Sequence, residues 1–155
     1  MRDTAWEIKH SVDSHASRPF AWSYMTNLAN WDDPPATFEL EGPFAVGTRG
    51  KTRMPGQELR RWQLVEVNQL ESYVLETELD EAVMAFEWRF DEIAGGTRIT
   101  QRIVLKGENA AAYVTQVAAA FESNLAAGMS RIVAAIEQAE GRAVQGAPAC
   151  ASDAG

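Results

Sequence analysis

Apolar residues recur in steps of three and four along one long stretch, residues 109–139. This spacing predicts an amphipathic helix, with Asn109 as its N-cap and Gly141 as its terminator. About thirty residues at about 1.5 Å each make a rod roughly 45 Å long, and its apolar side must be buried against another element of the protein. Gly128 and the alanines of the stripe either let a partner or ligand approach closely or reflect helix propensity alone. The stripe consists of Val114, Val117, Phe121, Leu125, Gly128, Ile132 and Ile136, flanked by Ala118, Met129 and Val133.

Apolar and polar residues alternate along seven other segments, and this period of two predicts β-strands. The first segment is residues 4–12. The others follow one another with connections so short that only an antiparallel meander fits. Pairs such as Gly42-Pro43 and Pro55-Gly56 mark those turns. The remaining predicted strands are 37–41, 48–54, 59–67, 72–79, 83–91 and 97–105.

Two short helices are predicted between the first and second strands. Residues 17–25 begin with Ser17 as a cap and Pro19 in the first turn, where no N–H is needed. Residues 28–31 form a second turn, which ends before Pro34 and Pro35. A long helix and a one-sided sheet must cover each other, so we predict an α+β fold: a seven-stranded curved antiparallel sheet wrapped around a long C-terminal helix, with the short helices between strands 1 and 2. We expect a cavity inside the curve, with residues 27–35 and the 55–56 turn as its gates.

Composition narrows the class of protein. The chain has 155 residues, enough for one domain over residues 1–141, whereas residues 142–155 have little to bury and are predicted to be disordered. No apolar run is long enough to cross a membrane, and the N-terminus has no apolar core like that of a signal peptide, so we expect a cytoplasmic protein. The net charge of −8 argues against binding to nucleic acid or anionic membranes. With Cys150, His10 and His15 as the whole set of cysteines and histidines, we expect no metal and no cofactor.

Short motifs stand at the predicted caps and turns. They are Ala16-Ser17-Arg18-Pro19-Phe20-Ala21-Trp22, Leu28-Ala29-Asn30-Trp31, Leu40-Glu41-Gly42-Pro43, Val46-Gly47-Thr48-Arg49-Gly50, Val65-Glu66-Val67 and Gly95-Gly96-Thr97-Arg98-Ile99-Thr100. Together they resemble the START/Bet v 1-like (SRPBCC) superfamily, especially its bacterial polyketide cyclase/dehydrase-like branch, over roughly residues 5–140. The resemblance implies the helix-grip fold. It does not choose a function, because members of the superfamily include carriers of lipids, sterols and plant hormones, polyketide aromatase/cyclases and quinone-binding proteins.

Aromatic residues are the first candidates for ligand contact, because rigid apolar rings are the usual lining of a concave pocket. Ordinary core packing is the alternative for each ring. Two polar residues, His10 and Gln101, share strand faces with apolar neighbours and would either orient a ligand or be satisfied by the protein. The aromatic candidates are Trp22, Tyr24 and Trp31 near the short helices, Trp62, Tyr73, Phe86 and Trp88 on strands, and Phe121 on the long helix.

A basic cluster on the third predicted strand has two interpretations. Arg53, with Arg49 and Lys51, would clamp a carboxylate or phosphate of a ligand. Alternatively, the cluster lies on a solvated outer face and pairs with Glu39 and Glu41 across the sheet.

We therefore predict binding of a small hydrophobic or aromatic molecule, lipid-, quinone- or polyketide-like, between the sheet and the C-terminal helix. The first alternative is a polyketide cyclase or dehydratase that uses the same cavity. The second is a non-enzymatic protein-interaction module. The chain has no Gly-x-Ser-x-Gly elbow and no phosphate-binding glycine-rich loop, so catalytic residues are not assigned and binding is favoured over catalysis. A homodimer is left open.

Overall fold

The computed structural model describes residues 4–31 and 36–154, with side chains as far as Arg142. Every strand lies within two residues of its predicted bounds, and the order of the elements is the predicted one. The elements are β1 (Thr4–Ser14), α1 (Arg18–Met25), η1 (Leu28–Asn30), β2 (Thr37–Leu40), β3 (Arg49–Arg53), β4 (Arg60–Asn68), β5 (Ser72–Leu79), β6 (Ala82–Ile93), β7 (Gly96–Lys106), η2 (Ala110–Tyr113), α2 (Val114–Phe121) and α3 (Leu125–Ala154).

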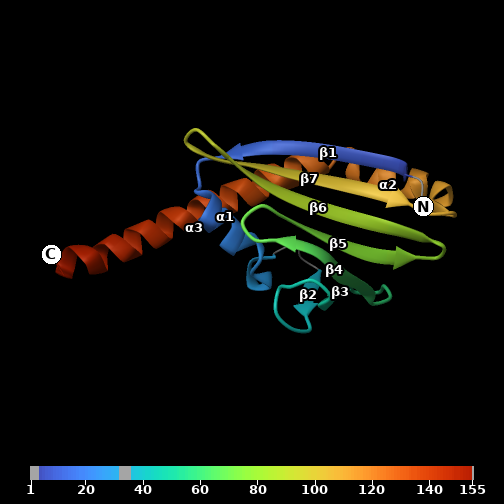
Figure 1. Ribbon diagram of the computed structural model, residues 1–155, viewed down its shortest axis with the longest axis horizontal. Coiled ribbons are helices and arrows are strands. Elements are labelled where there is room, and N and C mark those ends of the chain that lie inside the picture. The colour runs from blue at the N-terminus through green and yellow to red at the C-terminus, as the bar shows by residue number, and fades with distance from the viewer. Residues whose placement is uncertain (1–3, 32–35, 155) are drawn as a thin grey trace.

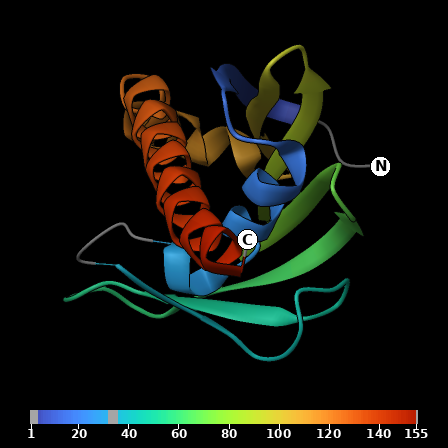
Figure 2. The ribbon, with the colours of Figure 1, turned by 90° about the vertical axis from the view of Figure 1, so that its left-hand side faces the viewer.

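One antiparallel sheet contains all seven strands, in the order β1-β7-β6-β5-β4-β3-β2. Consecutive strands from β2 to β7 are neighbours, as short turns require, and β1 joins the far edge beside β7 (Figure 1). Seen along its length, the sheet bends so that α1 and α3 lie inside the bend (Figure 2). This is the predicted helix-grip arrangement.

The start of α1 follows from its sequence. The Ser17 hydroxyl accepts a hydrogen bond from the Phe20 N–H at 3.3 Å, and Pro19 occupies the first turn, where its missing N–H leaves no gap. The next turn, η1, begins after Asn27, whose side chain accepts from the Ala29 N–H. Of the predicted gate 27–35, residues 32–35 lie outside the described residues.

The two faces of the sheet differ in chemistry. The outer face carries charged residues in cross-strand pairs, such as Arg98 with Asp13 and Arg102 with Glu7. The inner face carries the apolar partners of the same strands and packs against the helices. Fully buried members of this inner core are Tyr73, Phe90, Leu64, Ile99, Ile103, Leu105, Met129 and Ile136.

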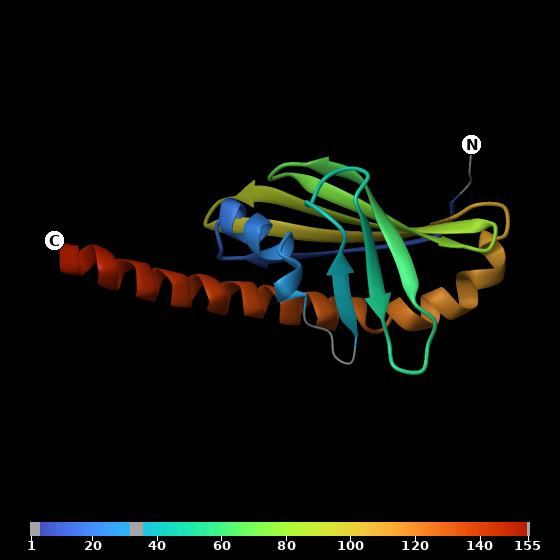
Figure 3. The same cartoon turned by 90° about the horizontal axis from the view of Figure 1, so that it is seen from below.

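The long helical stretch was predicted to be one continuous rod, but in the structure it is divided. A turn at residues 122–124 separates α2 from α3 (Figure 3). The Asn124 side chain in this turn donates to the Ala120 carbonyl. The predicted N-cap is also wrong, because the Asn109 amide donates to the Asp80 carbonyl and makes no cap hydrogen bond. Nor does Gly141 end the helix, since α3 continues to Ala154 and its last turns project beyond the sheet (Figure 1). Disorder of residues 142–155 in solution stays a prediction.

The buried seam of α3 consists of Leu125, Met129, Val133 and Ile136, at helical spacing. Gly128 lies beside this seam rather than in it. A Cβ atom built on Gly128 would meet a single heavy atom within 4 Å, the Arg131 guanidinium at 3.8 Å. Close approach of another backbone therefore does not explain this glycine.

Candidate ligand-binding site

Four of the predicted site residues form one row across the inner face. His10 on β1 is the register partner of Gln101 on β7, which pairs with Trp88 on β6, which pairs with Tyr73 on β5. Val67 on β4 continues the row on the other side of Tyr73. The structure thus brings together residues that the sequence analysis could place only on separate strands.

Tyr73 is the most unusual member of this row. Its side chain is fully buried, and its hydroxyl has no hydrogen-bond partner among the described residues. Burial raises the pKa of this phenol well above its ordinary value, so the group is neutral at physiological pH. It can therefore donate a hydrogen bond but cannot serve as a base.

Three aromatic rings surround Tyr73. Phe44 lies edge-on at 4.9 Å between ring centroids, Trp22 edge-on at 6.0 Å, and Phe90 stacks at 6.3 Å. Trp22 and Phe90 also contact each other edge-on at 5.5 Å. These contacts have the offset and perpendicular geometries that aromatic pairs favour, and they leave the hydroxyl in an apolar environment.

A second aromatic group lies at the β2–β3 end of the inner face. Trp31 stacks on Trp62 at 5.6 Å and meets Phe38 edge-on at 5.5 Å. The Trp62 indole donates to the Thr52 hydroxyl, and its ring lies over Gly50, where a Cβ atom would come within 2.2 Å of the ring. The rings of this group are therefore held by partners within the protein.

The other aromatic candidates pack at the margins of the core. Phe86 on β6 meets Phe121 on α2 edge-on at 5.9 Å, and Tyr24 on α1 is half-buried against the same core. They do not contact Tyr73 through an aromatic pair within the described residues.

Arg53 does not join the site. Its guanidinium lies 3.2 Å from the Glu39 carboxylate, and its neighbour Lys51 lies 3.6 Å from Glu41. This is the outer-face arrangement that the sequence analysis kept as its alternative. A clamp for an anionic ligand inside the curve is therefore not formed by these residues.

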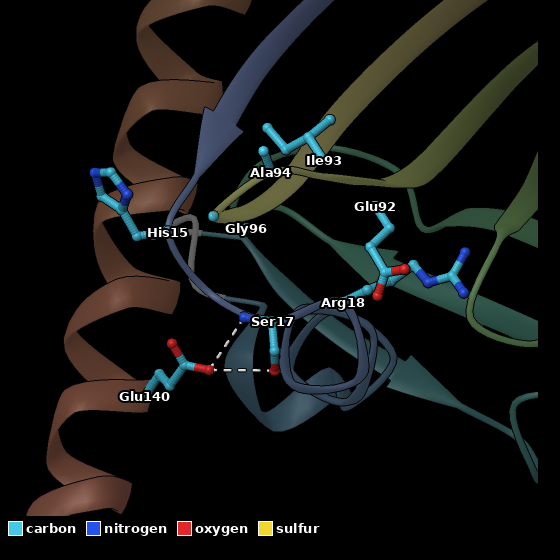
Figure 4. Close-up of a pocket in the computed structure, with 9 residues that line it drawn as sticks. His15, Ser17, Arg18, Glu92, Ile93, Ala94, Gly96 and Glu140 are labelled. Atoms are coloured by element: carbon cyan, nitrogen blue, oxygen red, sulfur yellow. Dashed lines mark hydrogen bonds between the residues drawn. The ribbon is translucent and has the colours of Figure 1, made fainter.

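A hollow of about 580 Å³ opens where the β1–α1 connection, the β6–β7 turn and α3 meet (Figure 4). Two α3 carboxylates hold this connection: Glu137 accepts from the His15 N–H at 2.7 Å, and Glu140 accepts from the Ser17 N–H at 3.1 Å. The hollow is lined by His15, Ser17, Arg18, Glu92, Ile93, Ala94, Gly95, Gly96 and Glu140. None of the predicted site residues lines it, and no periodic pattern marks it, because its three segments are far apart in the sequence.

Two of the rings around Tyr73 were not among the predicted site residues. Phe90 shares the alternation of Phe86 and Trp88 on β6, so the sequence pattern already places the three rings on one face, although Phe90 was not chosen as a site residue. Phe44 lies in the irregular connection between β2 and β3, where no period indicates which way a side chain points.

Within residues 4–31 and 36–142, whose side chains the structure describes, no three His, Cys, Asp or Glu side chains are grouped so that they could hold a metal ion. Among the described helices, none has the length and hydropathy needed to span a bilayer.

The curved seven-stranded sheet, closed over a long C-terminal helix, defines a helix-grip protein of the Bet v 1-like class. The chain belongs to the polyketide cyclase/dehydrase and lipid transport family, whose model matches residues 5–137. The comparison with curated proteins found no match.

Solved structures share this fold at low sequence identity. Norcoclaurine synthase from Thalictrum flavum, as a point mutant with a transition-state analogue, is 13% identical, with a TM-score of 0.66 over 89% of this chain and 98% of the other. The same enzyme with dopamine and hydroxybenzaldehyde is 14% identical, with a TM-score of 0.64 over 85% of each chain. A protein from Nitrosomonas europaea is 9% identical, with a TM-score of 0.64 over 85% of this chain and 94% of the other. At these identities the likeness shows the fold alone.

Proposed function

We propose that this protein binds a small hydrophobic or aromatic molecule on the inner face of its sheet, beside Tyr73. The observation that carries the proposal is the Tyr73 hydroxyl, which is fully buried and has no partner within the described residues. Buried polar groups in folded proteins are nearly always hydrogen bonded, so an exception at the centre of a concave face suggests a partner that comes from outside the chain.

The free-energy balance supports the same conclusion. A buried hydroxyl without a partner destabilises a protein by about 1–3 kcal/mol, and a bound acceptor would recover part of that. The rings of Trp22 and Phe90 would supply apolar contact area around the bound molecule. One polar group within an apolar surround is the usual composition of a small-molecule site.

The comparisons are compatible with this reading. The family description names both polyketide cyclases and lipid transport, two activities that handle hydrophobic molecules. One structure of the same fold holds dopamine and hydroxybenzaldehyde, which are small aromatic compounds.

Binding fits the geometry better than acid–base catalysis by the predicted residues. His10 and Tyr73 are three strand spacings apart in their row, about 14 Å at about 4.8 Å per spacing. A general acid and a general base must each reach the reacting atoms at hydrogen-bond distance, and of these two roles the neutral Tyr73 hydroxyl can take only that of the donor. A cyclase or dehydratase therefore remains the second candidate, with Tyr73 as a hydrogen-bond donor only.

The test is a thermal-shift screen of the full-length protein against fatty acids, quinones, flavonoids, sterols and aromatic polyketides. A compound at a hundred times its dissociation constant adds about 2.7 kcal/mol to the free energy of unfolding, or roughly 5–10 °C in Tm for a chain of this length. A hit that also protects the amides of β5 and β6 from hydrogen exchange supports the proposal. The absence of any shift across the panel would refute it and favour the protein-interaction alternative.

A further inference from the structure

The charged side chains of the sheet that form ion pairs lie on its outer face, whereas Tyr73 lies on the inner face. The described ion pairs on strands join residues of the outer face: Lys51–Glu41, Arg53–Glu39, Arg98–Asp13, Arg102–Glu7, Arg102–Glu87 and Lys106–Glu76. On the inner face, the row neighbours of Tyr73 are Val67 and Trp88, which carry no charge. The one titratable member of the row apart from Tyr73 is His10, at its far end.

This distribution discriminates between ligands by their charge. A carboxylate or phosphate placed beside the Tyr73 hydroxyl would leave water, find one hydrogen-bond donor and meet no opposite charge on the neighbouring row residues Val67 and Trp88. Burying an unpaired charge is far more unfavourable than one hydrogen bond is favourable. A ketone, a quinone carbonyl or a phenol needs only the hydrogen bond, so the same site accepts it.

The three rings around Tyr73 are not equally fixed. Trp22 belongs to α1 and Phe90 to β6, so moving either ring would disturb a regular element. Phe44, by contrast, is half-buried on the irregular connection 41–48. The backbone hydrogen bonds of this connection run from the Glu41 N–H to the Arg49 carbonyl, from the Gly47 N–H to the Leu64 carbonyl and from the Thr48 N–H to the Ala45 carbonyl. None of these three uses the backbone of Phe44. The Phe44 side chain can therefore move out of its present position while the hydrogen bonds between the strands stay in place.

We propose that the ligand is an uncharged aromatic compound with an oxygen acceptor, such as an aromatic ketone or quinone, and that it meets the Tyr73 hydroxyl in the place that the Phe44 ring now occupies. This inference rests on the proposed function and narrows it: fatty acids and other anions are excluded from the site. Phe44 fills the site until the ligand displaces it.

The first experiment compares matched probes that share one ring system: naphthalene, acetylnaphthalene, naphthoate and naphthylmethylammonium, with their substituents at the same ring position. Dissociation constants are measured by calorimetry at neutral pH. We expect acetylnaphthalene to bind about tenfold more tightly than naphthalene, the value of one hydrogen bond, and naphthoate to bind at least about a hundredfold more weakly than acetylnaphthalene.

The Tyr73→Phe variant should remove the preference for acetylnaphthalene over naphthalene while leaving naphthalene binding intact. Tyr113→Phe is the matched control, because the Tyr113 hydroxyl bonds to Asp80 at the opposite end of β5. That variant should keep the preference. If naphthoate or the ammonium probe binds as tightly as acetylnaphthalene, or if the preference survives in Tyr73→Phe, the inference fails and the proposed function stands. If no probe binds up to its solubility limit, the proposed function fails with it.

The second experiment tests the displacement of Phe44. Phe44→Ala should bind acetylnaphthalene several-fold more tightly and faster, because no ring has to leave the site. The control is Val46→Ala on the same connection, since Val46 is 62% exposed and its loss should change neither rate nor affinity. Weaker binding by Phe44→Ala would show that Phe44 is a wall of the site rather than its occupant, and would overturn this part of the inference.

Discussion

Replacing Tyr73 with phenylalanine should make the unliganded protein more stable. The change removes one oxygen atom that is fully buried and has no partner in the described structure, and it keeps the ring that packs on Phe44, Trp22 and Phe90. An unsatisfied buried hydroxyl destabilises the folded state by about 1–3 kcal/mol, so the free energy of unfolding should rise by that amount. For a chain of this length the corresponding increase in Tm is about 2–12 °C.

The assay is urea unfolding at neutral pH, followed by circular dichroism and tryptophan fluorescence, with the slope of each transition compared between variants. Tyr113→Phe is again the matched control. The Tyr113 hydroxyl accepts from the Asp80 N–H at 3.1 Å and donates to the Asp80 carbonyl, so its loss should reduce stability by about 1 kcal/mol. The same chemical change is thus expected to have opposite signs at the two positions.

Alkaline pH gives a second test of the buried Tyr73 hydroxyl. Burial raises the pKa of Tyr73 in the folded state, whereas an unfolded tyrosine ionises near pH 10. Above that pH the unfolded chain loses a proton that the folded protein keeps, so stability should fall by about 1.4 kcal/mol per pH unit. Tyr73→Phe should lack this component. Lower stability of Tyr73→Phe at neutral pH would refute the reasoning, because it would mean that the hydroxyl has a partner in the native state. An unchanged alkaline slope would also refute it, because it would mean that the phenol ionises as easily in the folded protein as in the unfolded chain.

Three further substitutions test the packing. Gly128→Ala should stabilise the protein by about 0.5–1 kcal/mol, because a methyl group there has room and favours the helix; a loss in urea unfolding would place Gly128 in the seam. Gly50→Ala should destabilise by about 1–3 kcal/mol, since its Cβ would overlap the Trp62 ring, and an unchanged unfolding midpoint would contradict that placement. Glu137→Ala should cost about 0.5–1.5 kcal/mol by removing the acceptor of the His15 N–H, whereas Glu137→Gln, which keeps an oxygen, should lose less.

Alternation was a reliable guide to the strands, because a strand with one buried face repeats every two residues whatever its neighbours are. The same pattern placed His10 and Gln101 on strand faces with apolar neighbours, and the structure pairs them in one row with Tyr73. The pattern could not place them in one row, because register between strands depends on turn geometry and on irregularities such as the shift between Leu64 and Glu66.

The long helix shows where periodicity misleads. Apolar spacing continues across the turn at residues 122–124, so nothing in the pattern indicates that α2 and α3 are separate. Gly141 resembles a terminator, yet a glycine within a helix has only a modest cost, and the chain around it continues as helix. Phe44 was missed for the opposite reason, since an irregular connection has no period at all.

The pairing of β1 with β7 has a consequence for biosynthesis. Ser11 and Thr100, whose hydroxyls are hydrogen bonded across this pair, are 89 residues apart in the chain. At about 5–20 residues per second, a ribosome needs roughly 5–20 s to make the partner of the first strand. During that time the apolar face of β1, with Trp6, Ile8 and Val12, has no sheet to join. The first strand to be made is therefore among the last to be paired, because β1 cannot join the sheet before β7 has been translated.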